Sequence, residues 1–165
     1  MNTGMCTIIV RPIKANLKRD TNWFFRMDPM VEVILGGEAK YKSPEDKNGG
    51  KHPHWNTIIG HIGIKVNEMD LTVYDKGLND GEPVGHVNVN LEKLYRLQTV
   101  KEWYPLEFRG KQVGEIYLQM EYFPAGQSSP LVKSGTFEFK ENSKVGESYL
   151  ENSKSWTNSL IDSRL

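Results

Sequence analysis

The sequence has little of what disulfide frameworks, membrane spans and nucleic-acid surfaces require. It holds one cysteine, Cys6, which excludes an internal disulfide and most multi-cysteine metal sites. Its first apolar run covers only residues 8–10, too short for a signal peptide or a membrane-spanning helix. The 21 basic and 21 acidic residues cancel, which argues against the net basic field of a nucleic-acid-binding protein. We therefore expect a cytoplasmic protein with no nucleic-acid partner.

Catalytic motifs are also missing. The sequence has no Gly-x-Ser-x-Gly, no phosphate-binding Gly-rich loop and no His-Glu-x-x-His. His52 and His54 flank Pro53, but no cysteine or third histidine is near enough in sequence to complete a metal site, so surface turn histidines are expected. The sequence therefore predicts a protein that is not an enzyme and has no small-molecule substrate.

Apolar residues alternate with polar ones along the first 122 residues. Alternation over four or more positions predicts half-buried β-strands. It occurs in residues 8–10, 31–35, 71–73, 87–91 and 116–122. Turn residues such as Gly36-Gly37 and Arg109-Gly110 separate these segments, and only residues 92–98 favour a short helix. The pattern predicts an all-β fold, an eight-stranded antiparallel β-sandwich over residues 1–124.

The composition changes at Pro124. Residues 124–165 hold nine serines and no long apolar alternation, so we expect residues 125–165 to form an extended, largely irregular tail. Two interpretations stay open: a disordered tail without a partner, or a segment that orders on a protein assembly. In the second case the large side chains serve as anchors, and the candidates are Phe137, Tyr149, Trp156 and Leu160.

Six segments, in order, resemble the C2 domain family, a β-sandwich module that binds calcium, phospholipid or protein. They include Asp28-Pro29-Met30-Val31, with methionine at the family's tyrosine position, and His52-Pro53-His54-Trp55-Asn56. The full set covers residues 8–17, 27–33, 52–56, 71–75, 84–85 and 103–106 with 114–124. One strand precedes the Asp-Pro segment and a Gly-x-Ile-x-Leu strand closes the domain, an order that resembles the family's phospholipase-type topology.

The resemblance implies a calcium site, which this sequence matches only in part. Asp28 and Asp75 stand at two aspartate positions of the family. The neutral Asn22 and the longer Glu82 stand at two others, and Gly77 offers no side chain at a fifth. Ligand charge and site rigidity govern calcium affinity. We therefore expect a degenerate site and no cofactor, with weak calcium binding left open.

An aromatic triplet, Trp23-Phe24-Phe25, lies in the first loop of the expected sandwich. Three consecutive rings cannot all point into a core from a loop tip, so a contact surface for protein or membrane is predicted. Arg26 and Lys76 are near enough in the expected loops to meet anionic headgroups. The alternative is that two rings cap the sandwich and one is exposed.

Lys40 and Lys42 alternate after a glycine turn, so both face the same way on the expected strand. The resemblance implies a basic patch here that binds phosphoinositides or acidic proteins. Glu38, Glu45 and Asp46 dilute that patch, and a solvated edge strand whose lysines oppose aggregation is favoured.

These features predict a non-enzymatic interaction module that docks onto a protein assembly through the aromatic triplet and the tail. The alternative is a peripheral membrane protein that binds anionic phospholipid with weak assistance from calcium. A peripheral membrane or cytoskeletal location fits either hypothesis. The discriminating feature is what the triplet touches: protein if it is buried in an interface, lipid if it is free and faces solvent.

Overall fold

A computed structural model describes residues 4–77, 81–127 and 129 of the chain. It contains eight strands and one short helix, which confirms the predicted all-β class and the predicted helix near residue 92. The predicted tail anchors Phe137, Tyr149, Trp156 and Leu160 lie outside the described residues. The elements are β1 (Cys6–Leu17), β2 (Pro29–Leu35), β3 (Ala39–Lys42), β4 (Ile59–Gly63), β5 (Glu68–Asp75), β6 (Glu82–Asn90), α1 (Glu92–Leu97), β7 (Thr99–Phe108) and β8 (Lys111–Phe123).

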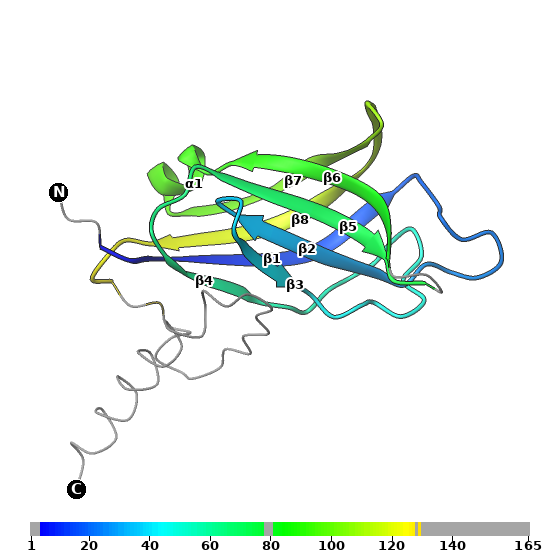
Figure 1. The fold of residues 1–165 in the computed structure, drawn as a ribbon, viewed down its shortest axis with the longest axis horizontal. Coiled ribbons are helices and arrows are strands. Elements are labelled where there is room, and N and C mark those ends of the chain that lie inside the picture. Colours follow the sequence, from blue (N-terminus) through cyan, green and yellow to red (C-terminus); the bar gives the residue numbers. More distant parts are fainter. Residues whose placement is uncertain (1–3, 78–80, 128, 130–165) are drawn as a thin grey trace, which may run out of the picture.

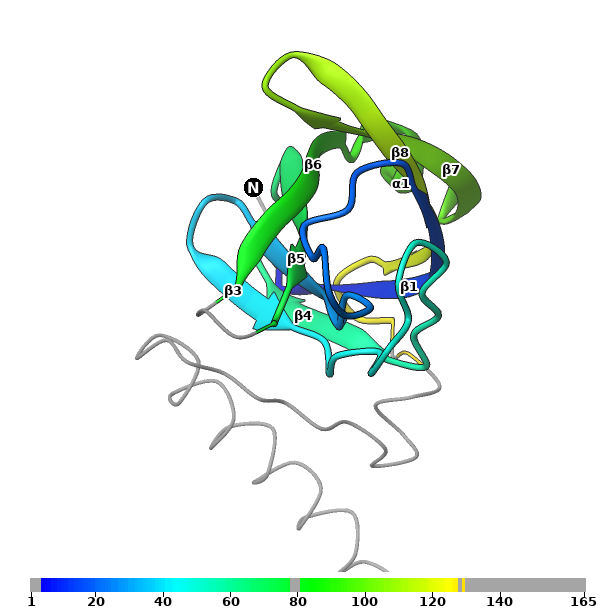
Figure 2. The same ribbon diagram turned by 90° about the vertical axis from the view of Figure 1, so that its right-hand side faces the viewer.

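The strands are hydrogen-bonded in the order β3-β2-β5-β6-β7-β8-β1-β4, and every pair is antiparallel. β6 and β7 are joined through the register pair His86 and Glu107. This narrow link divides the strands into two four-stranded layers, which Figure 2 shows end-on. β1 opens the domain beside the closing strand β8 and leads to Asp28-Pro29, which is the phospholipase-type order predicted from the sequence.

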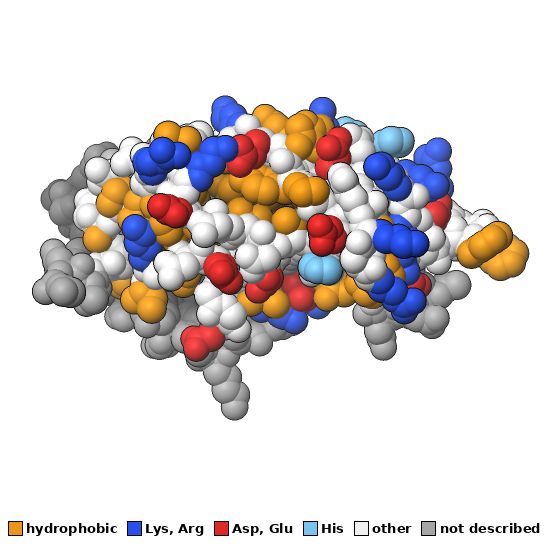
Figure 3. Space-filling model, turned by 90° about the horizontal axis from the view of Figure 1, so that it is seen from above, with side chains coloured by type: hydrophobic (Ala, Val, Ile, Leu, Met, Phe, Trp, Pro, Cys, Tyr) orange, Lys and Arg blue, Asp and Glu red, His pale blue; other side chains and the backbone are white. Residues whose placement is uncertain are grey.

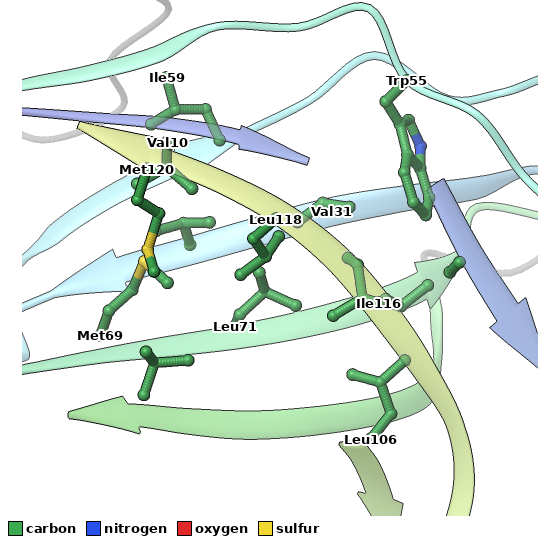
Figure 4. Packing of buried hydrophobic residues seen from close by; sticks show 14 of the residues in the cluster. Val10, Val31, Trp55, Ile59, Met69, Leu71, Leu106, Ile116, Leu118 and Met120 are labelled. Atoms are coloured by element: carbon green, nitrogen blue, oxygen red, sulfur yellow. The ribbon is translucent and has the colours of Figure 1, made fainter. Parts of the chain in front are cut away.

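The core lies between the two layers, where alternate side chains of each strand meet (Figure 4). Val31 of β2 and Leu71 of β5 face Leu118 and Ile116 of β8, and all four are fully buried. Each such side chain contributes roughly 1.5–3 kcal/mol when it leaves water. Trp55 closes one part of this core, and its indole N–H donates to the Pro29 carbonyl oxygen at 3.0 Å. The alternation in the sequence is therefore the alternation of inward and outward strand positions.

Four connections meet at one end of the sandwich, which we call the loop end. They are the β1–β2 loop (residues 18–28), the β3–β4 loop (43–58), the described residues 76–77 and 81 of the β5–β6 loop, and the β7–β8 turn (109–110) (Figure 1). The β3–β4 loop is tied by backbone hydrogen bonds to the end of β1, from the Leu17 N–H to the Lys51 oxygen at 2.8 Å, and to the β1–β2 loop, from the Gly50 N–H to the Met27 oxygen at 3.0 Å. The helix α1 lies at the opposite end (Figure 1).

Candidate functional site

The tip of the β1–β2 loop carries the aromatic triplet. Trp23, Phe24 and Phe25 are 95%, 90% and 69% exposed. The apolar projection at the right-hand end of Figure 3 lies where this loop extends in Figure 1. The alternative in which two rings cap the sandwich is therefore not observed. The residues of the triplet instead form a projecting apolar tip, which we call the aromatic tip.

Asn22 shapes the backbone that displays the aromatic tip. Its Oδ1 accepts hydrogen bonds from the N–H groups of Phe24 at 3.2 Å and Phe25 at 3.1 Å. Asp20 makes the same kind of bond two residues before Asn22, because its Oδ1 accepts a hydrogen bond from the Asn22 N–H at 3.1 Å. Asx side chains stabilise turns by such bonds to the following backbone. The Asn22 side-chain oxygen therefore accepts its hydrogen bonds within the loop itself.

Asp75 and Asp28, the two predicted calcium ligands that match the family, do come together. Asp75 is 4% exposed, and its carboxylate accepts from the N–H groups of Asp28 at 2.9 Å and Gly77 at 3.2 Å and from the Thr21 hydroxyl at 2.7 Å. The Asp28 carboxylate accepts from the Asn48 N–H at 2.7 Å. The two aspartates therefore join the β1–β2, β3–β4 and β5–β6 loops through hydrogen bonds.

Glu82 is engaged elsewhere. Its carboxylate accepts from the Arg19 guanidinium at 2.8 Å, and the same guanidinium donates to the Pro83 oxygen at 2.9 Å and lies 3.9 Å from the centre of the Phe108 ring. Within the described residues no group of three or more histidine, cysteine or acidic side chains is placed to hold a metal ion. Calcium requires six to eight oxygen ligands. The described side chains at this end do not supply that number of ligands.

The cations beside the aromatic tip differ in their partners. Lys76 pairs with Glu45 at 2.5 Å, a contact that lowers the pKa of the Glu45 carboxyl. Arg26 is exposed and makes no hydrogen bond or ion pair with any described residue. Further basic side chains at the loop end are Lys18, Lys47, Lys51, Arg109 and Lys111. Acidic side chains lie at the same end and pair with some of these cations, as Asp20 does with Lys51 and Glu45 with Lys76. Arg26 is therefore the cation next to the apolar tip that has no acidic partner among the described residues.

Lys40 and Lys42 share a face of β3, as predicted, but they do not form a free patch. Both ammonium groups pair with the buried carboxylate of Glu32 on β2, at 3.2 Å and 3.4 Å. Glu32 lies directly opposite Lys42 in the β2–β3 register. Glu32 therefore partly neutralises the two lysines. The loop end, and not this strand, is the candidate contact surface.

The sequence did not indicate the roles of Thr21 and Asn48 in the site, or the pairing of Arg19 with Glu82. Asn48 stands in the Asn-Gly-Gly turn and has a left-handed φ of 58°, so the turn was predicted but the target of its N–H was not. Thr21 and Arg19 act on partners more than 50 residues away. A local sequence pattern cannot predict contacts between residues so far apart in the chain.

A family model for the C2 domain matches residues 6–106. The chain belongs to the C2 domain family. Members of this family bind phospholipid membranes and proteins, and the family itself is a binding module without catalytic chemistry. Some members bind calcium, as in a calcium-bound structure of the two C2 domains of extended synaptotagmin 2. The described part of this C2 domain includes no helix with the length and apolarity that crossing a bilayer requires.

Relatives of known sequence or structure agree with this assignment. Ingression protein fic1 of Schizosaccharomyces pombe is 25% identical over 122 residues, which cover 72% of this chain and 44% of the yeast protein. A structure of a C2 domain-containing protein is 23% identical, with a TM-score of 0.61 and coverage of 75% of this chain and 92% of that one. Human GIVD cytosolic phospholipase A2 is 16% identical, with a TM-score of 0.64 and coverage of 76% and 17%. The structural matches establish the fold.

Proposed function

We propose that this C2 domain is a peripheral membrane module that docks on anionic phospholipid by inserting Trp23, Phe24 and Phe25 at the bilayer surface. The observation that carries the proposal is the exposure of three consecutive aromatic side chains at a loop tip, at 95%, 90% and 69%. The relative named for ingression fits a role at a membrane.

The chemistry of the loop end suits a bilayer interface. Tryptophan and other aromatic rings are favoured at the level of the lipid headgroups, where the bilayer is apolar on one side and hydrated on the other. Burying one such side chain contributes about 1.5–3 kcal/mol, and a nearby lysine or arginine adds about 1 kcal/mol on an anionic surface. Arg26 is exposed directly beside the aromatic tip. These contributions support reversible binding.

Calcium is not required in this proposal. Both oxygens of Asp75 and one oxygen of Asp28 already accept hydrogen bonds from backbone N–H groups and from the Thr21 hydroxyl. A calcium ion at these carboxylates competes with those donors. The loops are instead held in place by the hydrogen bonds, so the aromatic tip is presented without a metal.

A protein partner is the second candidate, and one observation away from the loop end favours it. On the outer face of the β7-β8-β1 strands, Trp103 is 38% exposed and its ring centre lies 5.4 Å from that of Tyr117. The Lys14 ammonium lies 5.6 Å from the indole centre. Exposed aromatic side chains of this kind often carry the binding energy of protein interfaces.

Co-sedimentation with phosphatidylserine-containing vesicles tests the membrane proposal. We expect the wild-type protein to pellet with vesicles in the presence of a calcium chelator. The variant Trp23→Ser/Phe24→Ser/Phe25→Ser should remain in the supernatant. The matched control is Met5→Ser/Ile64→Ser/Leu97→Ser, which removes three other exposed apolar side chains and should pellet like the wild type. Equal pelleting of both triple variants contradicts the proposal.

A further inference from the structure

Ile9 of β1 is completely buried, although it lies on the outer face of its sheet. The core cluster includes its neighbours Ile8 and Val10, and successive side chains of a strand point to opposite faces, so Ile9 points away from the core. Its cross-strand neighbours are Glu121 on β8 and Gly60 on β4. Because Gly60 has no side chain, the 0% exposure of Ile9 requires cover from outside the sheet.

This cover is confined to one part of the outer face. Thr7, two residues before Ile9, is also buried, with 7% exposure. Farther along the same face Trp103 is 38% exposed. The ion pair of Arg11 with Glu121, at 3.0 Å, is only partly buried and lies between the two regions. The covering segment therefore lies over the start of β1 and does not extend over Trp103.

The chain that leaves β8 turns back at the same end of the sandwich. β8 ends beside the start of β1. The next four residues form a turn, in which the Gln127 N–H donates to the Pro124 oxygen at 3.0 Å and Gly126 has a left-handed φ of 83°. Gly126 and Gln127 are exposed, but Ser129 is 0% exposed. The chain therefore leaves the surface at the turn and returns to it by Ser129, at the end opposite the aromatic tip (Figure 1).

The residues that follow Ser129 have the composition to cover an apolar face. They lie outside the described residues, and their sequence continues Pro130-Leu131-Val132 and then alternates apolar and polar residues at 136–139. At about 3.3 Å per residue, Leu131 and Val132 stay within about 10 Å of Ser129. They are the first apolar side chains that can cover Ile9. β4 is the last strand in the order, and such edges are commonly covered by a loop or another segment.

We propose that residues 130–139 bind to the outer face of β1 and β4 as a strap, with Leu131 and Val132 packed over Ile9. This face is thus an internal docking surface whose occupant is the chain's own C-terminal segment. The strap covers an apolar side chain and an edge strand that would otherwise be open to pairing with another chain. The inference is independent of the proposed membrane function, because the aromatic tip lies at the other end of the sandwich.

Amide hydrogen exchange of the full chain tests the strap. Residues 130–139 should exchange more slowly in the protein than in a synthetic peptide of residues 128–141. Ile9→Ala should speed their exchange roughly tenfold relative to β5, because the strap loses most of the side chain on which it packs. The control Trp103→Ala changes the uncovered part of the same face and should leave their exchange as in the wild type. Exchange as fast as in the peptide, or an acceleration no greater than that of β5, overturns the proposal.

Nuclear Overhauser contacts identify what covers Ile9. The δ1 methyl group of Ile9 should show contacts to the methyl groups of Leu131 and Val132. These contacts should persist when the labelled protein is diluted into an excess of unlabelled protein, since they lie within one chain. Contacts that disappear on dilution assign the cover to a second copy, and contacts only to residues outside 130–139 assign it to another segment. Either result overturns the strap.

Discussion

At the residue scale, Asp75 shows how a side chain typical of a metal site becomes a structural brace. A buried carboxylate is costly unless donors compensate it. Here the donors are the N–H groups of Asp28 and Gly77 and the hydroxyl of Thr21, which come from two different loops. The carboxylate therefore stabilises the arrangement of the loop end by satisfying donors that would otherwise be buried without acceptors.

We predict that Asp75→Asn lowers the free energy of unfolding by about 1–3 kcal/mol, because a side-chain amide places an NH₂ group against donors that need an acceptor. Urea denaturation measures the change. Asp70→Asn is the control, since Asp70 is on the same strand but is exposed and accepts only from the Asn88 side chain, at 2.8 Å. If both variants lose the same stability, Asp75 is not a brace.

The tryptophans allow a second comparison between positions. Trp55 is 6% exposed and donates to the Pro29 oxygen, so Trp55→Ala should cost about 3–5 kcal/mol of unfolding free energy. The triple serine variant of the aromatic tip removes more aromatic surface but should change stability by no more than about 0.5 kcal/mol, because those rings are exposed. Urea denaturation of both variants checks the pair. A comparable loss in the triple variant means that the rings belong to the core.

At the element scale, the edge strands β3 and β4 are the two ends of the strand order, and side chains join them. The Tyr41 ring on β3 meets the His61 ring on β4 edge-on, with centres 6.0 Å apart, and the Tyr41 oxygen is 2.8 Å from His61 Nδ1. Burial lowers the pKa of His61 below its ordinary value of 6.5. The neutral imidazole is therefore the form that fits between the layers.

This arrangement predicts a pH dependence of stability. Because the pKa of His61 is lower in the folded state, the unfolded chain takes up more protons as the pH falls below 6.5. By linkage, the free energy of unfolding should then decrease with falling pH. His61→Gln should flatten this dependence, whereas the control His86→Gln, at an exposed position on β6, should keep it. Denaturation curves at neutral and mildly acidic pH measure both slopes, and an unchanged slope in His61→Gln counts against the prediction.

At the scale of the whole molecule, the sequence predicted the β-sandwich more readily than the side-chain contacts within it. Alternation identified the strands β1, β2, β5, β6 and β8 because inward positions repeat every two residues. Trp23-Phe24-Phe25 was predicted to form a contact surface because three consecutive rings at a loop tip cannot all point into a core, and all three are exposed. The pairing of Glu32 with Lys40 and Lys42 depends on strand register, which alternation does not specify. The division of the chain at Pro124 stays a prediction, as does the role of the tail.

The last prediction concerns calcium and the loop end as a unit. An ion that binds only the folded state raises the free energy of unfolding by about 2.7 kcal/mol when its concentration is a hundred times Kd. In this C2 domain an incoming ion meets both oxygens of Asp75 and one oxygen of Asp28 already paired to N–H and hydroxyl donors, and Glu82 paired to Arg19. We therefore expect millimolar calcium to change the midpoint of thermal unfolding no more than millimolar magnesium does. An upward shift that is specific to calcium and lost in Asp28→Asn/Asp75→Asn would show that the ion displaces those donors, and the requirement for calcium in membrane binding would have to be reconsidered.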